Sequence, residues 1–261
     1  MPELPEVEHA VRRLRRALRG RRIVAVRALH RAQARTLTPA VARRIAGHAI
    51  TGVTRRGKHQ LVHLDDGATL LVHFRLDGDW ELGRAGTAMP RHARVVFDLD
   101  GGRRAVLTDP RALCTVTYHR PGAPPDLALG PEAEDRAVTA AWLHGQLRTR
   151  RGPIKPVLLD QRLLAGLGNI YAQEACWRAG IHPAAAASSL SRPRVTRLLA
   201  GIRAALADGH TNAGRYREGE RVVPFKVYDR EGEPCRRCGA PLRRMVQAGR
   251  GTWYCGACQT R

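Results

Sequence analysis

Apolar and polar positions near the start of the chain repeat with the period of an α-helix. Four apolar residues recur at intervals of three or four: Val7, Val11, Leu14 and Leu18. This spacing places them on one face of a helix. Pro5 suits a first-turn position, and Gly20 is a plausible stop. The pattern predicts an amphipathic helix over residues 5–19 whose other face carries arginines. Such a face is usually solvated, and DNA contact there is the alternative.

From residue 23 to about residue 118 the chain changes to short runs rich in β-branched and other apolar residues. The clearest runs are 23–29, 60–64, 69–74, 94–99 and 104–108. Turn signals such as Asp-Asp-Gly at 65–67 separate them. One helix, at about 39–46, interrupts the series. A β-sandwich or barrel is therefore predicted.

The second half of the chain predicts helices and a small terminal module. Residues 121–135, rich in Pro, Gly and acids, resemble a linker. Helical segments are expected at about 138–148, 156–165, 171–179 and 192–207. We expect an α+β fold with an N-terminal helix and β-sandwich domain, a linker, a helical domain and a small C-terminal module. Their expected ranges are 1–120, 121–135, 136–230 and 231–261.

The composition and net charge of the chain indicate which kind of molecule it binds. The 261-residue chain is 43% hydrophobic, as a globular protein is, and its net charge is +22. That charge indicates a polyanionic partner, with nucleic acid first. An acidic membrane surface comes second, and a merely basic protein is the remaining alternative. No apolar stretch approaches the length of a membrane span, and the N-terminus lacks the pattern of a signal peptide.

Four of the six cysteines form two Cys-x2-Cys pairs near the C-terminus. They are Cys235, Cys238, Cys255 and Cys258. Two such pairs supply four thiolates for tetrahedral Zn²⁺, and a four-cysteine site leaves no open position for catalysis. We therefore expect one structural zinc in a small hairpin that presents arginines to phosphate. A pair of disulfides is the alternative. Cys114 and Cys176 are isolated and are expected to be buried.

The N-terminus holds candidate chemistry. Met1 before Pro2 is a start from which the initiator methionine is normally removed, which leaves a secondary amine. Such an amine can attack an aldehydic sugar carbon and form an iminium. Glu3 and Glu6 lie beside it and can transfer protons to a leaving base and a ring oxygen. Helix capping explains these two acids equally well.

The order of motifs along the chain resembles the formamidopyrimidine-DNA glycosylase and endonuclease VIII family. The opening, Met-Pro-Glu-Leu-Pro-Glu-Val-Glu, matches it residue for residue. Further matches are Arg-Gly-Lys at 56–58, Asp-Pro-Arg at 109–111, Ile-Lys-Pro at 154–156, Gly-Leu-Gly-Asn-Ile-Tyr at 166–171 and Gly-Ile-His-Pro at 180–183. The segment 227–235 leads into the finger as in the family. These matches span nearly the whole chain. They imply a catalytic β-sandwich domain, a DNA-binding domain with a helix–two-turn–helix, and a β-hairpin zinc finger.

The resemblance implies a base-excision-repair glycosylase with a lyase activity (β,δ-elimination) on damaged duplex DNA. It implies a monomer in the bacterial cytoplasm, associated with the nucleoid. Pro2 is implied as the Schiff-base nucleophile, Glu3 as the general acid and Glu6 as its support. Lys58 is implied to contact phosphate and assist β-elimination, and Arg250 to serve δ-elimination. The further implied DNA contacts are Leu76, His92, Arg111, Leu113, Arg150, Lys155 and Asn169.

Departures from the family pattern bear on the substrate. Leu76 and Leu113 stand where the family has a wedge methionine and a wedge aromatic residue. The segment 209–228 looks several residues shorter than the loop that closes over a flipped base in 8-oxoguanine-specific members. We therefore expect a preference for hydantoins or oxidised pyrimidines, with an ordinary 8-oxoguanine enzyme as the alternative. A retained Met1 would favour a damage-binding protein with little turnover. An RNA-binding zinc-ribbon protein is the third possibility.

Overall fold

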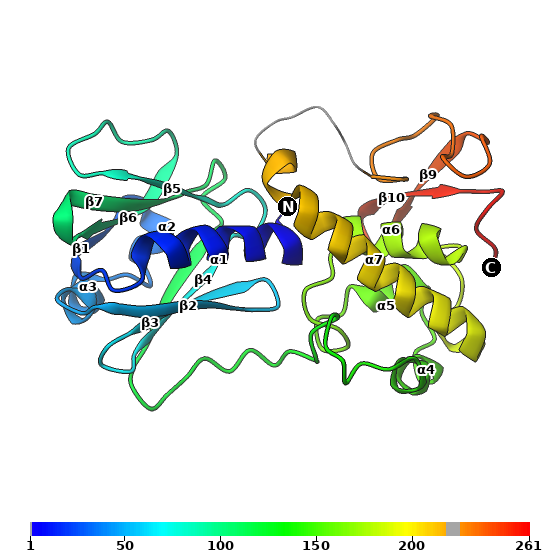
Figure 1. The fold of residues 1–261 in the computed structure, drawn as a ribbon, viewed down its shortest axis with the longest axis horizontal. Helices are drawn as coiled ribbons and strands as arrows, with labels where there is room; N and C mark the ends of the chain where they lie inside the picture. Colours follow the sequence, from blue (N-terminus) through cyan, green and yellow to red (C-terminus); the bar gives the residue numbers. More distant parts are fainter. Residues whose placement is uncertain (1, 218–224) are drawn as a thin grey trace. The chain divides into compact units, whose positions relative to one another are not determined.

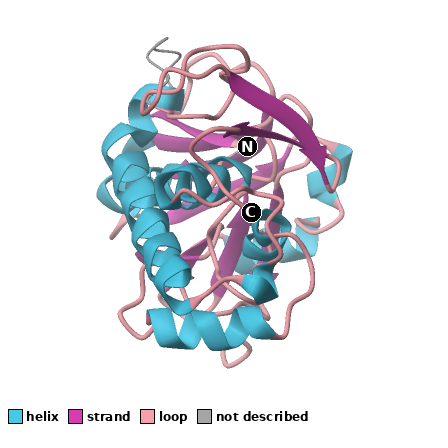
Figure 2. Cartoon of the chain, turned by 90° about the vertical axis from the view of Figure 1, so that its right-hand side faces the viewer, coloured by secondary structure: helices cyan, strands magenta, loops and turns pink. Residues whose placement is uncertain are grey.

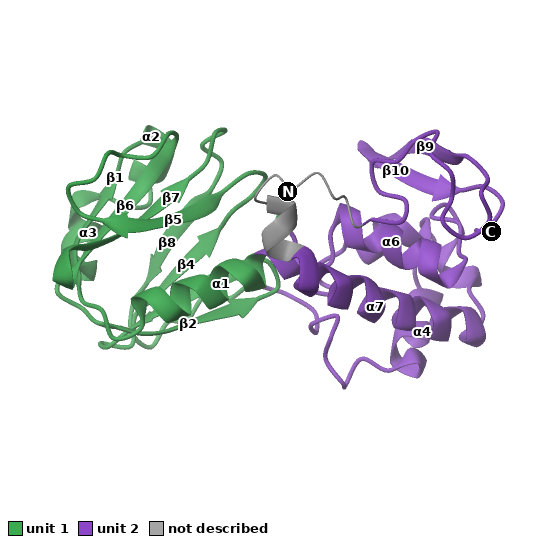
Figure 3. Cartoon of the chain, turned by 45° about the horizontal axis from the view of Figure 1, so that its top comes forward, with its two compact units in different colours: residues 1–2, 7–127 green, residues 3–6, 128–261 purple. Residues whose placement is uncertain are grey.

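The computed structural model describes residues 2–217 and 225–261. The chain divides into two compact units (Figure 3). Unit 1 comprises residues 1–2 and 7–127, and unit 2 comprises residues 3–6 and 128–261. The predicted α+β fold, with N-terminal sheets, a helical region and a zinc-finger hairpin, is confirmed.

Unit 1 holds most of the strands of the chain (Figure 1). Its helices are α1 (Leu4–Leu18, whose first three residues belong to unit 2), α2 (Arg31–Ala34) and α3 (Pro39–Ile45). Its strands are β1 (Ile23–Ala28), β2 (Ile50–Arg56), β3 (His59–Leu64), β4 (Thr69–His73), β5 (Asp79–Arg84), β6 (Ala93–Leu99), β7 (Arg103–Thr108) and β8 (Thr115–His119). A short 3₁₀ turn, η1 (Asp100–Gly102), joins β6 to β7.

The strands of unit 1 form two antiparallel four-stranded sheets. Their orders are β1-β6-β7-β5 and β2-β3-β4-β8. One apolar core contains residues from both sheets and the face of α1 formed by Val7, Val11 and Leu14. Burying one face of each sheet against the other and against the helix produces the predicted sandwich. Strands β2, β5 and β8 were not among the predicted runs.

Unit 2 is mainly helical, and its helices are among those drawn in cyan in Figure 2. Its helices are α4 (Ala140–Arg148), α5 (Ile154–Leu158), α6 (Asn169–Ala179) and α7 (Arg192–Arg217), with a 3₁₀ turn η2 (Ala187–Ser189). The helix predicted over 156–165 is wrong, because α5 ends at Leu158. The Gln161 side chain instead bonds the backbone of Leu159, Gly166 and Leu167 and holds two turns there.

The C-terminal hairpin pairs β9 (Leu242–Gln247) with β10 (Arg250–Cys255). Trp177 of α6 packs with Val227, Leu242 and two of the cysteines in a separate small apolar cluster. This packing joins the finger to the helical part of unit 2. No helix in the described part of the chain is both long and apolar enough to cross a membrane.

Candidate active site

The Glu3 carboxylate lies at the N-terminus of α6 in unit 2. The Ile170 N–H donates to its Oε1 (2.8 Å) and the Tyr171 N–H to its Oε2 (3.3 Å). The side chain is fully buried. Helix N-termini favour anions because their first N–H groups lack partners within the helix. Gly168 makes the approach possible, since a Cβ there would lie 2.2 Å from Glu3 Cδ.

Glu6 supports Glu3 from the first turn of α1. The Glu3 N–H donates to Glu6 Oε2 (2.9 Å), and the Tyr171 hydroxyl donates to Glu6 Oε1 (2.6 Å). The first contact is the reciprocal half of a capping box. Glu6 therefore does cap the start of α1, as the capping alternative expects. Glu3 precedes α1, but its carboxylate caps α6. Pro2, buried in unit 1, is bonded directly to Glu3.

Lys58 stands in the two-residue turn between β2 and β3. Gly57, the other turn residue, has a φ of +57°, as the twist of a tight hairpin requires. Next to it, His59 lies edge-to-face against His73 of β4, with ring centroids 4.6 Å apart. Burial is the main cause of a His73 pKa lowered to about 3, and the charges of His59, Arg75 and Lys58 contribute to that lowering. Burial also lowers the pKa of His59. The lowered pKa values favour the neutral form of both rings beside the lysine.

Two loops of unit 1 carry the expected wedge residues. Leu76 is half-buried in the turn between β4 and β5, and Leu113, after β7, is 46% exposed. Arg111 forms an ion pair with Asp77 at 2.8 Å, which connects the two loops. Buried Asp109 accepts N–H bonds from Arg111, Leu113 and the following cysteine, at 2.6–3.0 Å. Asp109 is therefore the residue that shapes the loop.

His92 and Arg150 are less closely tied to these groups. His92 has a φ of +62° in the turn before β6, and its carbonyl accepts from the Asp109 N–H. Arg150 follows α4, and its guanidinium donates to the carbonyl of Gln146 at 2.6 Å. Both side chains are partly exposed. Among the described residues, neither side chain forms a hydrogen bond or an ion pair with the side chain of another predicted residue.

Three predicted residues of unit 2 meet at the start of β10. The Gly251 carbonyl accepts from Asn169 Nδ2 (3.0 Å) and from Lys155 Nζ (3.4 Å). Lys155 Nζ also bonds the Thr252 hydroxyl. Arg250, adjacent to Gly251, is exposed and forms no ion pair within the described residues. The Arg250 guanidinium can therefore bind an anion, while the hydrogen bonds to Gly251 hold the adjacent backbone.

Lys155 is a fully buried lysine. Burial is the main cause of a pKa lowered to about 8, and the charge of Arg250 lowers it as well. Cys176 and Glu3 act in the opposite direction. A buried amine beside the helix that receives Glu3 can therefore change its charge near neutral pH.

Gln173 is a structural partner of this grouping that the sequence did not reveal. Its side chain is fully buried and lies one turn after Asn169 on α6. Its amide donates to the Asn169 carbonyl (2.7 Å), and its Oε1 accepts from the Trp253 N–H (2.7 Å). Gln173 thus connects α6 to β10. A lone glutamine in a helix carries no sequence signal for such a role.

Buried Glu174 binds the backbone of residues 226–228. Its carboxylate accepts from the N–H groups of Lys226, Val227 and Tyr228 at 2.8–3.1 Å. The expected loop over 209–228 includes residues 218–224, which lie outside the described residues. Its proposed shortening therefore stays a prediction.

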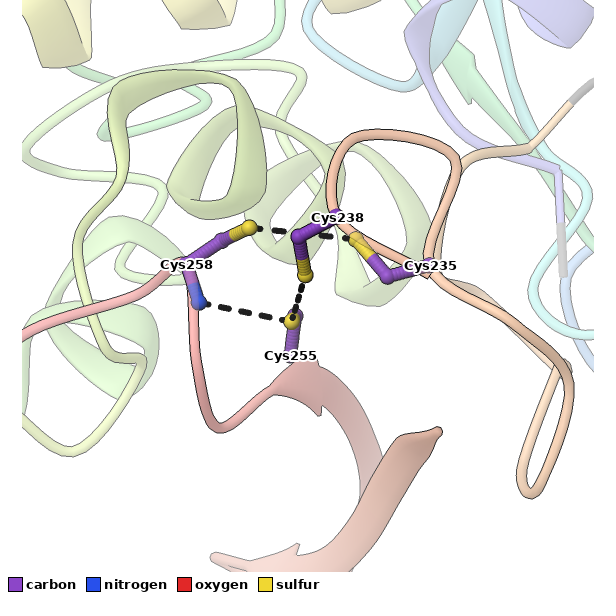
Figure 4. Close-up of side chains that lie close together, drawn as sticks. All are labelled: Cys235, Cys238, Cys255 and Cys258. Carbon is purple, nitrogen blue, oxygen red and sulfur yellow. Dashed lines mark hydrogen bonds between the residues drawn. The ribbon is translucent and has the colours of Figure 1, made fainter. Parts of the chain in front are cut away.

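The four cysteines of the finger converge as predicted (Figure 4). Their Sγ atoms all lie within 4.8 Å of one another. Cys235 and Cys258 are 4.0 Å apart, and Cys238 and Cys255 are 3.6 Å apart. Zn–S bonds of about 2.3 Å in a tetrahedron require sulfur atoms about 3.8 Å apart. The donor set fits one structural zinc, and the predicted metal is confirmed. Cys114 and Cys176 are buried thiols, as expected.

Fold and site together define a DNA glycosylase of base excision repair. Three family models match the chain in order: formamidopyrimidine-DNA glycosylase N-terminal domain (1–116), formamidopyrimidine-DNA glycosylase H2TH domain (129–216) and the zinc finger found in FPG and IleRS (232–261). The chain therefore belongs to the formamidopyrimidine-DNA glycosylase family. The predicted glycosylase/lyase enzyme class is confirmed by this assignment.

Curated relatives match over their full length. The formamidopyrimidine-DNA glycosylase of Chloroflexus aurantiacus is 40% identical, over 99% of this chain and 98% of the relative. That of Rhizorhabdus wittichii is 41% identical, over 99% and 100%. A Lactococcus lactis enzyme bound to DNA with an AP site has a TM-score of 0.90 at 28% identity. A MutM structure with DNA containing carbocyclic 8-oxo-G has a TM-score of 0.90 at 30% identity. Both comparisons cover 100% of each chain.

Proposed function

We propose that this protein excises oxidised bases from duplex DNA through an iminium formed by Pro2 and then cuts the strand by β,δ-elimination. The observation that carries the proposal is the Glu3 carboxylate, buried at the N-terminus of α6 and bonded in sequence to Pro2. A secondary amine next to a fixed proton-transfer group is what glycosidic displacement followed by ring opening needs.

The steps assign one task to each group. With Met1 removed, the Pro2 amine attacks C1′, and the base leaves with the electron pair of the broken C1′–N bond. The amine gives up its proton, and Glu3 moves a proton to the ring oxygen as the sugar opens to the iminium. Loss of the C2′ proton then expels the 3′ phosphate, and a second elimination expels the 5′ phosphate. Lys58 assists the first elimination and Arg250 the second.

The remaining predicted residues position the DNA in this proposal. Asn169 grips a phosphate together with Arg250, and Lys155 lies against the same β10 backbone. Leu76 and Leu113 enter the opened base step, with further contacts from His92, Arg111 and Arg150. Leucine can occupy a partly unstacked step. We propose further that the protein acts as a monomer on chromosomal DNA in a bacterial cytoplasm, where its zinc-binding thiols stay reduced.

For the lesion, we propose a preference for hydantoins or oxidised pyrimidines over 8-oxoguanine paired with cytosine. Leu113 lacks an aromatic face that would stack on a base. Alignments with curated relatives run over 271 to 299 positions, although this chain has only 261 residues. The relatives therefore carry at least ten residues that this chain lacks, and the proposal places part of this difference in the capping loop. Weak capping favours bases that are already poorly stacked.

Single-turnover excision from a panel of duplexes tests the lesion proposal. The panel contains 8-oxoguanine, formamidopyrimidine, hydantoin, thymine glycol, dihydrouracil and an abasic site, with Glu3→Gln as the inactive control. We expect hydantoin or dihydrouracil to be removed faster than 8-oxoguanine opposite cytosine. If 8-oxoguanine is the best substrate, the lesion proposal is wrong and the protein is an ordinary 8-oxoguanine enzyme. Strong binding with no product from any duplex would instead indicate a damage-binding protein.

A further inference from the structure

Unit 1 contains a groove that none of the proposed catalytic or DNA-binding residues lines. It has a volume of about 310 Å³ and lies between the last turn of α1 and strands β5, β6 and β7. We call it the arginine groove. It is lined by three leucines and by Arg16, Arg21, Arg103 and Arg104. With a rise of about 1.5 Å per residue, the end of α1 lies roughly 20 Å from the end next to Pro2.

The groove combines apolar and cationic walls. Leu18 and Leu99 are buried, whereas Leu82 is 36% exposed. Of the four arginines, Arg104 pairs with an aspartate at 2.7 Å and Arg21 with another at 3.7 Å. The lining therefore offers both leucine side chains and guanidinium groups.

Two of the arginines have no internal counter-charge. Arg16 and Arg103 are exposed, and neither forms an ion pair within the described residues. The negative end of the α1 dipole accounts for a cation at Arg16. It does not account for Arg103, which lies at the start of β7. The uncompensated charge of the groove is thus about +2, at a place that the proposed chemistry does not use.

We propose that the arginine groove binds a short acidic peptide segment of a partner protein, with an apolar side chain on the leucines and carboxylates on the arginines. Guanidinium groups recognise carboxylates through paired hydrogen bonds. A volume of about 310 Å³ is at the lower end for ligand sites and suits one or two side chains. Strand β5 is also an edge strand, so one side of its backbone can pair with an extended chain.

A nucleic-acid strand is the other polyanion to consider, and the apolar wall favours the peptide. Phosphates gain nothing from Leu82, whereas a peptide leucine or phenylalanine buries surface there. Arginines can bind either a peptide or a nucleic-acid strand. An affinity that depends on an apolar side chain of the ligand therefore distinguishes the peptide from the nucleic acid.

Fluorescence anisotropy with the full-length, zinc-loaded protein tests the proposal. The probe is a labelled peptide of six acidic residues around two leucines, and its control has serines in place of the leucines. The expected result is at least tenfold tighter binding of the leucine peptide. Arg16→Glu/Arg103→Glu should weaken that binding at least tenfold and leave nicking of abasic DNA unchanged, which also shows that the variant folds.

Matched variants and DNA competition decide the outcome. Arg43→Glu/Arg44→Glu makes the same charge change at exposed positions of α3 and should leave peptide affinity within twofold. An abasic-analogue duplex at saturation should not displace the peptide. Equal weakening by both double variants, equal affinity for both peptides, or displacement by the duplex would overturn the proposal. The last result would assign the groove to nucleic acid.

Discussion

Replacing Lys155 with methionine should remove a pH-dependent destabilisation of the fold. The lysine is fully buried, and burial lowers its pKa from 10.5 to about 8. The unfolded chain therefore holds more protons than the folded chain between pH 8 and pH 10.5. In that window the free energy of unfolding must rise with pH. A lowering of about 2.5 units at 1.36 kcal/mol per unit gives at most about 3 kcal/mol.

Urea unfolding at four pH values from 7.5 to 10.5 measures this effect, with zinc present throughout. The quantity to compare is the unfolding free energy of the wild type minus that of Lys155→Met. Other groups titrate in both proteins and largely cancel in the difference. We expect the difference to rise by up to about 3 kcal/mol across the window. Lys226→Met, which removes a lysine from a partly exposed position, is the matched control.

A constant difference would refute the reasoning, because it would show that Lys155 has the same pKa in both states. A falling difference would show that a buried anion holds the ammonium form. The Thr252 hydroxyl still donates to the Arg250 carbonyl in the variant, and the loss of its bond from Lys155 adds a cost that does not depend on pH and therefore leaves the trend intact.

Three further predictions follow from the contacts of unit 2 and from the net charge. Cys238→Ser should lose zinc and DNA affinity together, since a structural zinc contributes folding energy, and metal analysis with a binding assay checks both. Gln173→Leu should destabilise the protein by about 1–3 kcal/mol in urea unfolding, because the Trp253 N–H loses a buried acceptor. Gln173→Glu keeps that acceptor but sets a second acceptor against the Asn169 carbonyl, so it should not recover the loss. Binding to undamaged duplex should weaken by about 10³-fold or more between 50 and 200 mM salt for about six phosphate contacts, and a flat response would contradict a phosphate-based interface.

Local patterns predicted the elements whose burial follows a simple period. Helix α1 was expected over 5–19 and is found at Leu4–Leu18, because its apolar face enters the core intact. Strand β5 was missed because it is an edge strand in which Trp80 alone is buried, so no alternation appears. Helix α5 was overextended because a side chain, Gln161, ends it through contacts that periodicity does not encode.

Some features of the site could likewise be predicted from neighbouring residues, whereas others depend on contacts between residues far apart in the sequence. The zinc ligands were predictable, because cysteine spacing expresses the chemistry directly. The environment of Glu3 was not, because its partners Ile170 and Tyr171 lie more than 160 residues away. The same holds for Gln173, whose partner on β10 is 80 residues distant. Motif resemblance supplied the candidate residues, and the fold supplied the contacts that hold them.

Borohydride trapping on an abasic-site duplex tests the central claim most directly. An iminium is reducible, so the protein should form a covalent adduct with the DNA. Peptide mapping should place the adduct on Pro2, and a retained Met1 or an added N-terminal tag should abolish it. Lys58→Ala should still be trapped. Loss of trapping in Lys58→Ala, together with trapping by a protein whose N-terminus is blocked, would contradict the account and make the lysine the nucleophile.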